Sequence, residues 1–257
     1  MLLPYRAACR AIHPDEPLAK PTQVKVWPRS TQLLFPLLVC AAIAVVALLL
    51  PEYTGISTFW IFLPGFFTET ILLVCSLVLS AWLSRGHLSA FGFTWGTFRL
   101  RPWFFLWLVP MLAITTLEVV GSPAGSSAKA TGPGIGSPAA VILTIWIYAS
   151  VCEEIFTRGL LQSWLAPFAS CRMPLGKWGV SVPVLAASIF FAAMHVVLWP
   201  SLGPITLVVM FLAGILGLVA GIYRERTGSL IPAILIHSFF DIGGSLPFWV
   251  SSWLHRG

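Results

Sequence analysis

The chain has 257 residues, of which 58% are hydrophobic and only 9% are charged, and its mean hydropathy is +0.90. A soluble domain carries about 25% charged residues, so the composition excludes an ordinary soluble enzyme and indicates a polytopic membrane protein. The formal net charge of +6 would suggest nucleic acid as the partner of a soluble protein. Here the basic residues are informative through their positions between apolar segments, and we expect no nucleic-acid partner.

The predicted elements are transmembrane helices. Seven apolar segments follow one another in the chain: 32–50, 59–83, 102–120, 139–167, 181–199, 203–222 and 230–254. Because about 20 apolar residues span a bilayer, each segment is long enough to cross. The pattern therefore predicts an all-α, polytopic transmembrane helix bundle of about seven spans, in which the long fourth and seventh segments are tilted, kinked or partly interfacial.

Two polar stretches divide the chain. Residues 1–31 form a basic N-terminal arm with four prolines, and residues 121–138, GSPAGSSAKATGPGIGSP, have the composition of a flexible linker. The predicted organisation is therefore the arm 1–31, a three-span region 32–120, the linker 121–138 and a four-span region 139–254. Most of the intramembrane ionisable groups lie in the last of these, which we interpret as the catalytic region.

The positions of lysine and arginine predict the orientation in the membrane. One set of connections contains most of them, whereas the opposite side has only Lys129 and Arg256. Lysine and arginine concentrate in cytoplasmic loops. We therefore expect a multi-pass protein of the cell membrane, surrounded by lipid, with a cytoplasmic N-terminus. The residues on the basic side are Arg6, Arg10, Lys20, Lys25, Arg29, Arg85, Arg99, Arg101, Arg172, Lys177, Arg224 and Arg226.

Two adjacent glutamates, Glu153 and Glu154, lie in the apolar segment 139–167, with Arg158 shortly after them. A charge beside hydrocarbon is costly unless it is paired or faces water. Residues i and i+4 share a helix face, so Glu154 and Arg158 are predicted to pair, whereas Glu153 points elsewhere and is available as a base. The structural alternative is that both acids pair with Arg158 and only lock helices together, and this segment alone favours neither interpretation.

Two later segments add histidines. His195 in segment 181–199 would, on its own, more often be a packing residue than a functional one. In the last segment, His237 and Asp241 are four residues apart and share a face. Their structural alternative is a simple His–Asp hydrogen bond. Together, a base, two histidines and a second carboxylate from three spans suit proton transfer and water activation. Glu69 and Glu118 are the other acids within spans, expected near an interface or paired with another polar group.

These motifs resemble the CPBP family of intramembrane proteases, which includes the CAAX prenyl endopeptidases and bacteriocin-processing enzymes. The family pattern is EExxxR, then FxxxH, then HxxxN or HxxxD on successive helices. This chain has Glu153-Glu154-x-x-x-Arg158, Phe191-x-x-x-His195 and His237-x-x-x-Asp241 in that order. Residues 221–230, GIYRERTGSL, are also similar to the family's approach to its third motif. The resemblance covers roughly residues 139–245, and the N-terminal half matches only as generic spans.

The resemblance implies a role for each residue of the first two motifs. Glu153 would be the general base that activates water, assisted by His195. Glu154 and Arg158 would support and orient the site.

In the third motif, the resemblance implies that His237 and Asp241 stabilise the tetrahedral oxyanion. An ionised aspartate cannot donate a hydrogen bond to an oxyanion. We therefore expect Asp241 to orient His237 by accepting its N–H, because their i, i+4 spacing permits this contact.

The same residues could be a metal site. Two histidines and a glutamate are a recognised zinc set, so the alternative to a metal-free site is zinc at Glu153, His195 and His237. We expect no cofactor, because the sequence has no HExxH motif and Arg158 lies close enough to disfavour a bound cation.

The predicted function is that of an intramembrane endopeptidase of glutamate type, which cleaves a membrane-associated protein or peptide near its end. The alternatives are a zinc-dependent protease using the same cluster, a non-catalytic bacteriocin-immunity or scaffold protein, and a proton-coupled transporter. The transporter is disfavoured because the chain has no inverted repeat. Counting about 1.5 Å per residue places Glu153 and His237 toward the cytoplasmic half and His195 nearer the other side, unless tilt or a helix start near Pro183 brings them together. Convergence of these side chains is therefore the structural test of the prediction.

Overall fold

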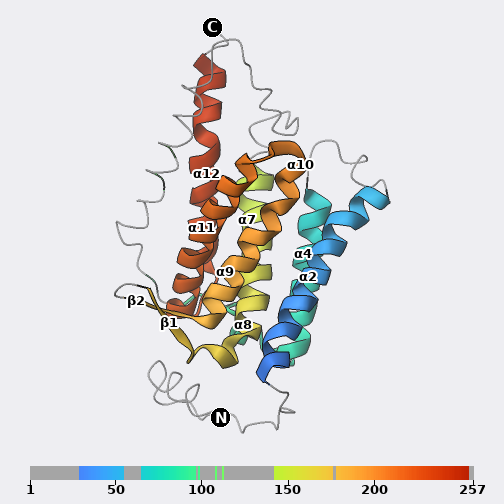
Figure 1. The fold of residues 1–257 in the computed structure, drawn as a ribbon, viewed down its shortest axis with the longest axis vertical. Helices are drawn as coiled ribbons and strands as arrows, with labels where there is room; N and C mark the ends of the chain where they lie inside the picture. Colours follow the sequence, from blue (N-terminus) through green and yellow to red (C-terminus); the bar gives the residue numbers. More distant parts are fainter. Residues whose placement is uncertain are drawn as a thin grey trace.

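The computed structural model describes residues 29–54, 65–96, 98, 108, 112, 142–175 and 178–254. Most of the predicted N-terminal arm, nearly all of the third apolar segment and the linker 121–138 lie outside the described residues. Within the described ranges the backbone is helical almost throughout (Figure 1), which confirms the predicted all-α bundle. Four described helices are long and apolar enough to cross a membrane, namely Thr31–Pro51, Phe66–Ser84, Val182–Leu202 and Ile205–Thr227. The count of seven spans stays a prediction.

The elements follow the predicted segments closely. The first part of the chain contains α2 (Arg29–Tyr53), α4 (Phe66–Ser84) and the 3-10 helix η1 (Leu88–Phe91). The second part contains η3 (Ile142–Ala149), α7 (Ser150–Glu154), η4 (Ile155–Leu161), α8 (Gln162–Trp164), η5 (Ala166–Phe168), β1 (Arg172–Leu175), β2 (Trp178–Ser181), α9 (Val182–Met194), η6 (His195–Leu198), α10 (Trp199–Leu202), α11 (Ile205–Thr227) and α12 (Ile231–Leu254).

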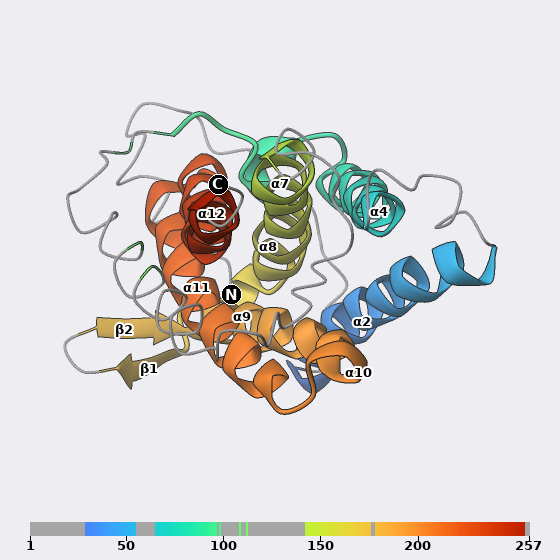
Figure 2. The same ribbon diagram turned by 90° about the horizontal axis from the view of Figure 1, so that it is seen from above.

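The segment with the two glutamates is one continuous helical run from Ile142 to Trp164. Wide π-helical turns, η3 and η4, flank the α-helical turn α7. Seen from above, α7 lies between α4 and α12 (Figure 2), while α9 and α11 contact the turn η4 that follows it. Every residue of η4 is buried. A charged side chain in this run must therefore find its partners inside the protein. The π-helical turns are a second indication of a functional site, because such turns are frequent there.

The fifth segment begins where the sequence predicts. The hydroxyl of Ser181 caps α9 by accepting a hydrogen bond from the backbone N–H of Val184 at 3.4 Å, and Pro183 lies in the first turn. Proline suits this position because the N–H groups of the first turn have no partner within the helix. The α-helix ends at Met194, and His195 opens the 3-10 turn η6.

The loop after η1 holds the turn that precedes α12. Oγ1 of Thr94 donates to the carbonyl of Gly228 at 3.1 Å, and Oγ of Ser229 donates back to the carbonyl of Thr94 at 2.6 Å. Gly96 has a φ of +58°, and a Cβ atom there would lie 2.7 Å from Cβ of Ser229. The two segments therefore fit closely, and this contact positions the start of α12.

A short β-hairpin joins the fourth and fifth segments, where the sequence predicted no strand. Its antiparallel register pairs Arg172 with Ser181 and Met173 with Val180. Arg172 donates across the hairpin to the carbonyl of Gly179 at 2.8 Å and also pairs with Glu225 of α11. The hairpin corrects the purely helical prediction in a connection too short to show a strand pattern.

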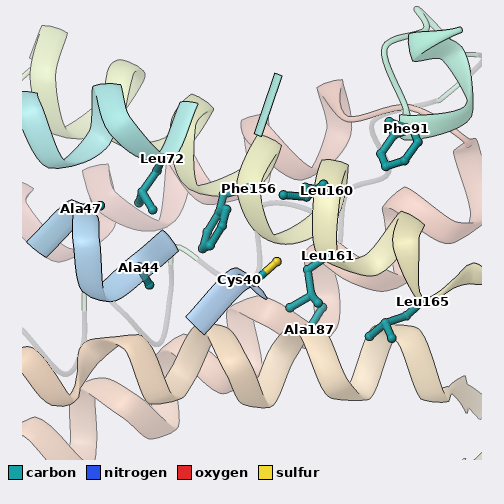
Figure 3. Packing of buried hydrophobic residues seen from close by; sticks show 10 residues of the cluster. All are labelled: Cys40, Ala44, Ala47, Leu72, Phe91, Phe156, Leu160, Leu161, Leu165 and Ala187. Atoms are coloured by element: carbon teal, nitrogen blue, oxygen red, sulfur yellow. The ribbon is translucent and has the colours of Figure 1, made fainter. Parts of the chain in front are cut away.

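An apolar core joins α2 and α4 to the central run and α9 (Figure 3). Small residues of α2 recur on one face and let this helix approach its neighbours closely. Within a membrane, such close van der Waals packing is a main source of helix association. The buried residues of this core are Cys40, Ala44, Ala47, Leu72, Phe91, Phe156, Leu160, Leu161, Leu165 and Ala187.

Candidate active site

Glu154 and Arg158 form a buried ion pair on the central run. Nη1 of Arg158 lies 3.0 Å from Oε1 of Glu154, and neither side chain is exposed. The guanidinium also donates to Oγ1 of Thr157. This is the i, i+4 pairing predicted from helical phase, and it persists although π-helical turns follow Glu154.

One imidazole joins the two glutamates. Nδ1 of His237 lies 2.8 Å from Oε1 of Glu154, at hydrogen-bond distance. On the opposite edge of the ring, Nε2 lies 3.6 Å from Oε2 of Glu153. Because a carboxylate only accepts, Nδ1 carries the proton in this contact, and the hydrogen bond directs Nε2 toward Glu153.

The two glutamates differ in their access to the outside. The side chain of Glu153 is 20% exposed, whereas that of Glu154 is fully buried. At 3.6 Å, Glu153 makes no direct hydrogen bond to His237, so its carboxylate keeps lone pairs for a water molecule. Burial and contacts therefore agree with the predicted pairing of Glu154 with Arg158, and the role of Glu153 as a base stays a prediction.

Asp241 does not hold His237 as predicted. Its Oδ2 atom lies 3.7 Å from Nε2 of His237, which is too far for a hydrogen bond. Oδ2 instead accepts a hydrogen bond at 2.9 Å from the hydroxyl of Ser150, one turn before Glu153. Orientation of His237 comes from Glu154 on another helix, and the expected contact within α12 is wrong. Ser150 was given no role from the sequence, because its contact with Asp241 joins residues 91 positions apart and leaves no local pattern.

His195 joins the cluster through an aromatic ring. Its Nδ1 lies 2.9 Å from the carbonyl oxygen of Phe191, and its ring meets the Phe191 ring edge to face at 4.9 Å between centroids. The same phenyl ring lies 5.4 Å from the ring of His237. Among the described residues no ion pair or hydrogen bond links His195 to Glu153. Counting helical rise separated the histidines in depth, but both contact one phenylalanine.

Comparison with known families places this geometry in context. Residues 135–243 match the family model of the type II CAAX prenyl endopeptidase Rce1-like proteins. This region is therefore similar to the Rce1-like family. Comparison with curated proteins and with solved structures gave no match. The matched residues, called the Rce1-like region below, include the three motifs and all six predicted site residues, and with the four apolar helices they support an integral membrane protein of the CAAX protease type.

Phe191 is the common neighbour of the charged groups in the Rce1-like region. Its ring is almost fully buried, and Cζ of Arg158 lies 4.5 Å from the ring centroid. A desolvated cation–π contact contributes about 2 kcal/mol. Phe191 therefore contacts the guanidinium and both histidines. Sequence analysis named this residue only as part of a motif.

The buried charges of the Rce1-like site depend on one another. In the described part of the chain, Oε2 of Glu154 and Nη2 of Arg158 are buried without a hydrogen-bond partner. Removing one member of a buried ion pair costs about 3–5 kcal/mol because the other charge is left uncompensated. The pair is therefore a requirement for the local fold as well as for the position of His237.

The described residues contain no group of three His, Cys, Asp or Glu side chains arranged to hold a metal ion. The zinc set considered from the sequence, Glu153, His195 and His237, is not among such groups, and whether the site uses a metal stays a prediction.

Glu69 approaches the site from outside the Rce1-like region. It lies in the first turn of α4. The next residue of this turn, Thr70, contacts the central run, because its Oγ1 lies 2.7 Å from the hydroxyl of Tyr148. Glu69 interacts electrostatically with Glu153 and with the carboxylate of α12. The sequence assigned Glu69 only to an interface or an unspecified polar partner. Glu118, the other acid considered, lies outside the described residues.

Proposed function

We propose that this protein is an intramembrane endopeptidase of glutamate type, which hydrolyses a peptide bond in a membrane-associated protein or peptide. The observation that carries the proposal is the bridging position of His237, which is fixed by the buried Glu154 on one edge and directed at the accessible Glu153 on the other. The Rce1-like match supports the broader part of this proposal, namely that the protein is a protease of the CAAX type.

In the proposed reaction, Glu153 is the general base. Its carboxylate takes a proton from a water molecule while the water oxygen attacks the carbonyl carbon of the scissile bond. The protonated Glu153 then delivers this proton to the amide nitrogen as the C–N bond breaks, which leaves a new carboxyl group and a new amine. A positioned base of this kind contributes about 10²–10⁴-fold to the rate.

His237 acts on the oxygen of the tetrahedral intermediate in this scheme. Held at Nδ1 by Glu154, the imidazolium donates from Nε2 to the developing negative charge. Arg158 keeps Glu154 in place through the 3.0 Å ion pair. Such preorganised donors are effective because they need no reorientation during the reaction.

The remaining two residues have supporting roles in the proposal. His195 donates from Nδ1 to the Phe191 carbonyl, which leaves Nε2 of its neutral form as an acceptor for the attacking water. Asp241, held by Ser150, supplies negative charge near Nε2 of His237. This role replaces the orientation by hydrogen bond expected from the sequence.

The proposed reaction uses no metal. The guanidinium of Arg158 already provides the positive charge beside Glu154, and a second cation would meet its repulsion. Zinc bound at Glu153, His195 and His237 is the alternative, and experiment must distinguish it from the metal-free reaction.

The proposed substrate class follows from the family description and the apolar helices. A CAAX-type endopeptidase cleaves near the C-terminus of a chain that is anchored to the bilayer. We propose a substrate of this kind for a protein of the cell membrane whose basic connections, and hence its N-terminus, face the cytoplasm.

The test uses the purified full-length protein in liposomes with a farnesylated CAAX peptide and its unprenylated twin. We expect hydrolysis of the farnesylated peptide in H₂¹⁸O to place one ¹⁸O atom in the new carboxyl group, with an unchanged rate after treatment with a zinc chelator. Loss of activity on chelation, with recovery on added zinc, would favour the metal-dependent alternative. Absence of cleavage in both peptides and in membrane-anchored precursors would favour a non-catalytic role.

A further inference from the structure

We propose that Gly217 of α11 is a positioning residue of the candidate active site, because its missing side chain provides the space that the guanidinium of Arg158 occupies. The inference rests on the proposed function and extends the site to a helix that supplies none of its motif residues.

Side chains surround the guanidinium of Arg158 on every side except the one that faces α11. Nη1 faces Glu154 at 3.0 Å and contacts Thr157. Cζ of the guanidinium lies over the ring of Phe191, 4.5 Å from its centroid. Nη2 is directed at α11, where Gly217 lies. The guanidinium is thus enclosed by its own helix, by α9 and by the backbone of α11.

A side chain at position 217 would enter this space. A Cβ atom built there lies 3.0 Å from Nη2 of Arg158, 3.0 Å from Cα of Ser188 and 3.1 Å from Cβ of Ser188. Non-bonded carbon atoms are most stable at about 3.5–4.0 Å, so an added methyl group displaces its neighbours. Ser188 contributes backbone on the tightly packed helix α9, so the guanidinium is the group with more freedom to move.

Displacement of Arg158 is transmitted to His237 through direct contacts. The guanidinium pairs with Oε1 of Glu154, and the same oxygen lies 2.8 Å from Nδ1 of His237. A shift of a few tenths of an ångström at Arg158 therefore alters the position of the imidazole that faces Glu153. Gly217 acts on the reaction through these groups and does not itself reach the reacting atoms.

Two neighbouring glycines of α11, Gly214 and Gly221, serve as a comparison that distinguishes this role from simple helix packing. At Gly214 the nearest atom to an added Cβ is Cβ of Ala192 at 3.7 Å, which is an ordinary contact. At Gly221 the Cβ would meet Cγ1 of Val184 at 3.0 Å and Oε1 of Gln162 at 3.1 Å, neither of which belongs to the site. Of these three glycines of α11, Gly217 is the one whose Cβ would touch a charged group of the site.

The test is a double-mutant cycle with full-length protein in liposomes and the farnesylated peptide. We expect Gly217→Ala to lower kcat about tenfold with little change in KM, and Gly214→Ala to stay within about twofold of the parent. In an Arg158→Lys background, which lacks Nη2, Gly217→Ala should cost no more than about twofold. An equal loss in both backgrounds, or an equal loss from Gly214→Ala, would overturn the inference, because helix spacing alone would then explain it.

A measurement without substrate separates this inference from the proposed function. In protein labelled with ¹⁵N-histidine, the His237 resonance is identified by its loss in His237→Asn. We expect Gly217→Ala to move this resonance in the direction that Arg158→Lys does, and Gly214→Ala to leave it unchanged. An unmoved resonance in Gly217→Ala would refute the inference even if the protease assignment holds, and a moved one supports it even if Glu153→Gln remains active.

Folding of the variant is also informative. If Gly217→Ala fails to accumulate in the membrane, restoration of its level by Arg158→Lys supports the proposed clash with the guanidinium. Continued absence of the double variant, with normal levels of Arg158→Lys alone, would overturn it.

Discussion

Replacing Arg158 by methionine removes the buried cation while keeping a long apolar side chain against Phe191. Loss of one partner of a buried ion pair costs about 3–5 kcal/mol. Because Glu154 retains His237 at 2.8 Å, we expect a loss near the lower end, about 3 kcal/mol. For a chain of this length this corresponds to a decrease in Tm of about 6–12 °C. Adding Glu154→Gln to Arg158→Met removes the stranded charge and should restore most of this loss.

The assay is thermal unfolding in detergent micelles followed by circular dichroism. Arg172→Met is the matched control, because its side chain is 52% exposed and its pairing with Glu225 lies at the surface. Exposed ion pairs contribute about 0–1 kcal/mol, so this variant should melt close to the parent. An Arg158→Met protein as stable as the parent, or a double variant no more stable than Arg158→Met, would refute the claim that the pair is held by mutual burial.

Two further predictions concern contacts that support the site. Ser150→Ala removes the 2.9 Å hydrogen bond to Asp241, and we expect kcat on the farnesylated peptide to fall about tenfold without loss of the folded protein. Ser201→Ala, which removes a hydrogen bond at the exposed end of α10, serves as the control, and equal activity of the two variants would contradict the role given to Asp241. Gly96→Ala brings a Cβ to 2.7 Å from Ser229, whereas Gly86 also has a positive φ, of +88°, and a Cβ there meets nothing within 4 Å. Both substitutions strain the backbone, so the added contact with Ser229 should make Gly96→Ala less stable than Gly86→Ala by about 1–3 kcal/mol in thermal unfolding. Equal stabilities of the two variants would contradict the claim that this loop positions the start of α12.

Helical phase was a good guide to contacts within the central run. The i, i+4 rule predicted the pairing of Glu154 with Arg158 and left Glu153 on another face, and the exposed fractions of the two glutamates agree with that division. These contacts depend only on the local helix geometry, which the residue spacing contains.

The partners of His237 could not be predicted in this way. The spacing within α12 favours Asp241, but Glu154 of the central run comes closer, at 2.8 Å against 3.7 Å. Which of two possible acceptors binds an imidazole depends on the rotation and depth of one helix relative to another. A pattern within a single helix does not contain that information.

The depth of His195 relative to Glu153 was the other open point. Rise per residue placed His195 away from Glu153, and the structure shows that one residue, Phe191, contacts both His195 and His237. Such a contact depends on the tilt and rotation of one helix relative to another, which a count of rise along a single helix does not contain. The β-hairpin and the contribution of Ser150 were missed because each depends on a tertiary contact.

The most direct test of the account is the rate of peptide-bond hydrolysis by Glu153→Gln in liposomes, with Glu225→Gln as a control that neutralises a similarly exposed acid outside the site. The amide keeps the shape of the side chain but cannot take a proton from water. We predict that Glu153→Gln loses about 10²–10⁴-fold in kcat while its Tm and the His237 resonance stay close to those of the parent, and that Glu225→Gln remains active. Full activity of Glu153→Gln would contradict the assignment of Glu153 as the catalytic base.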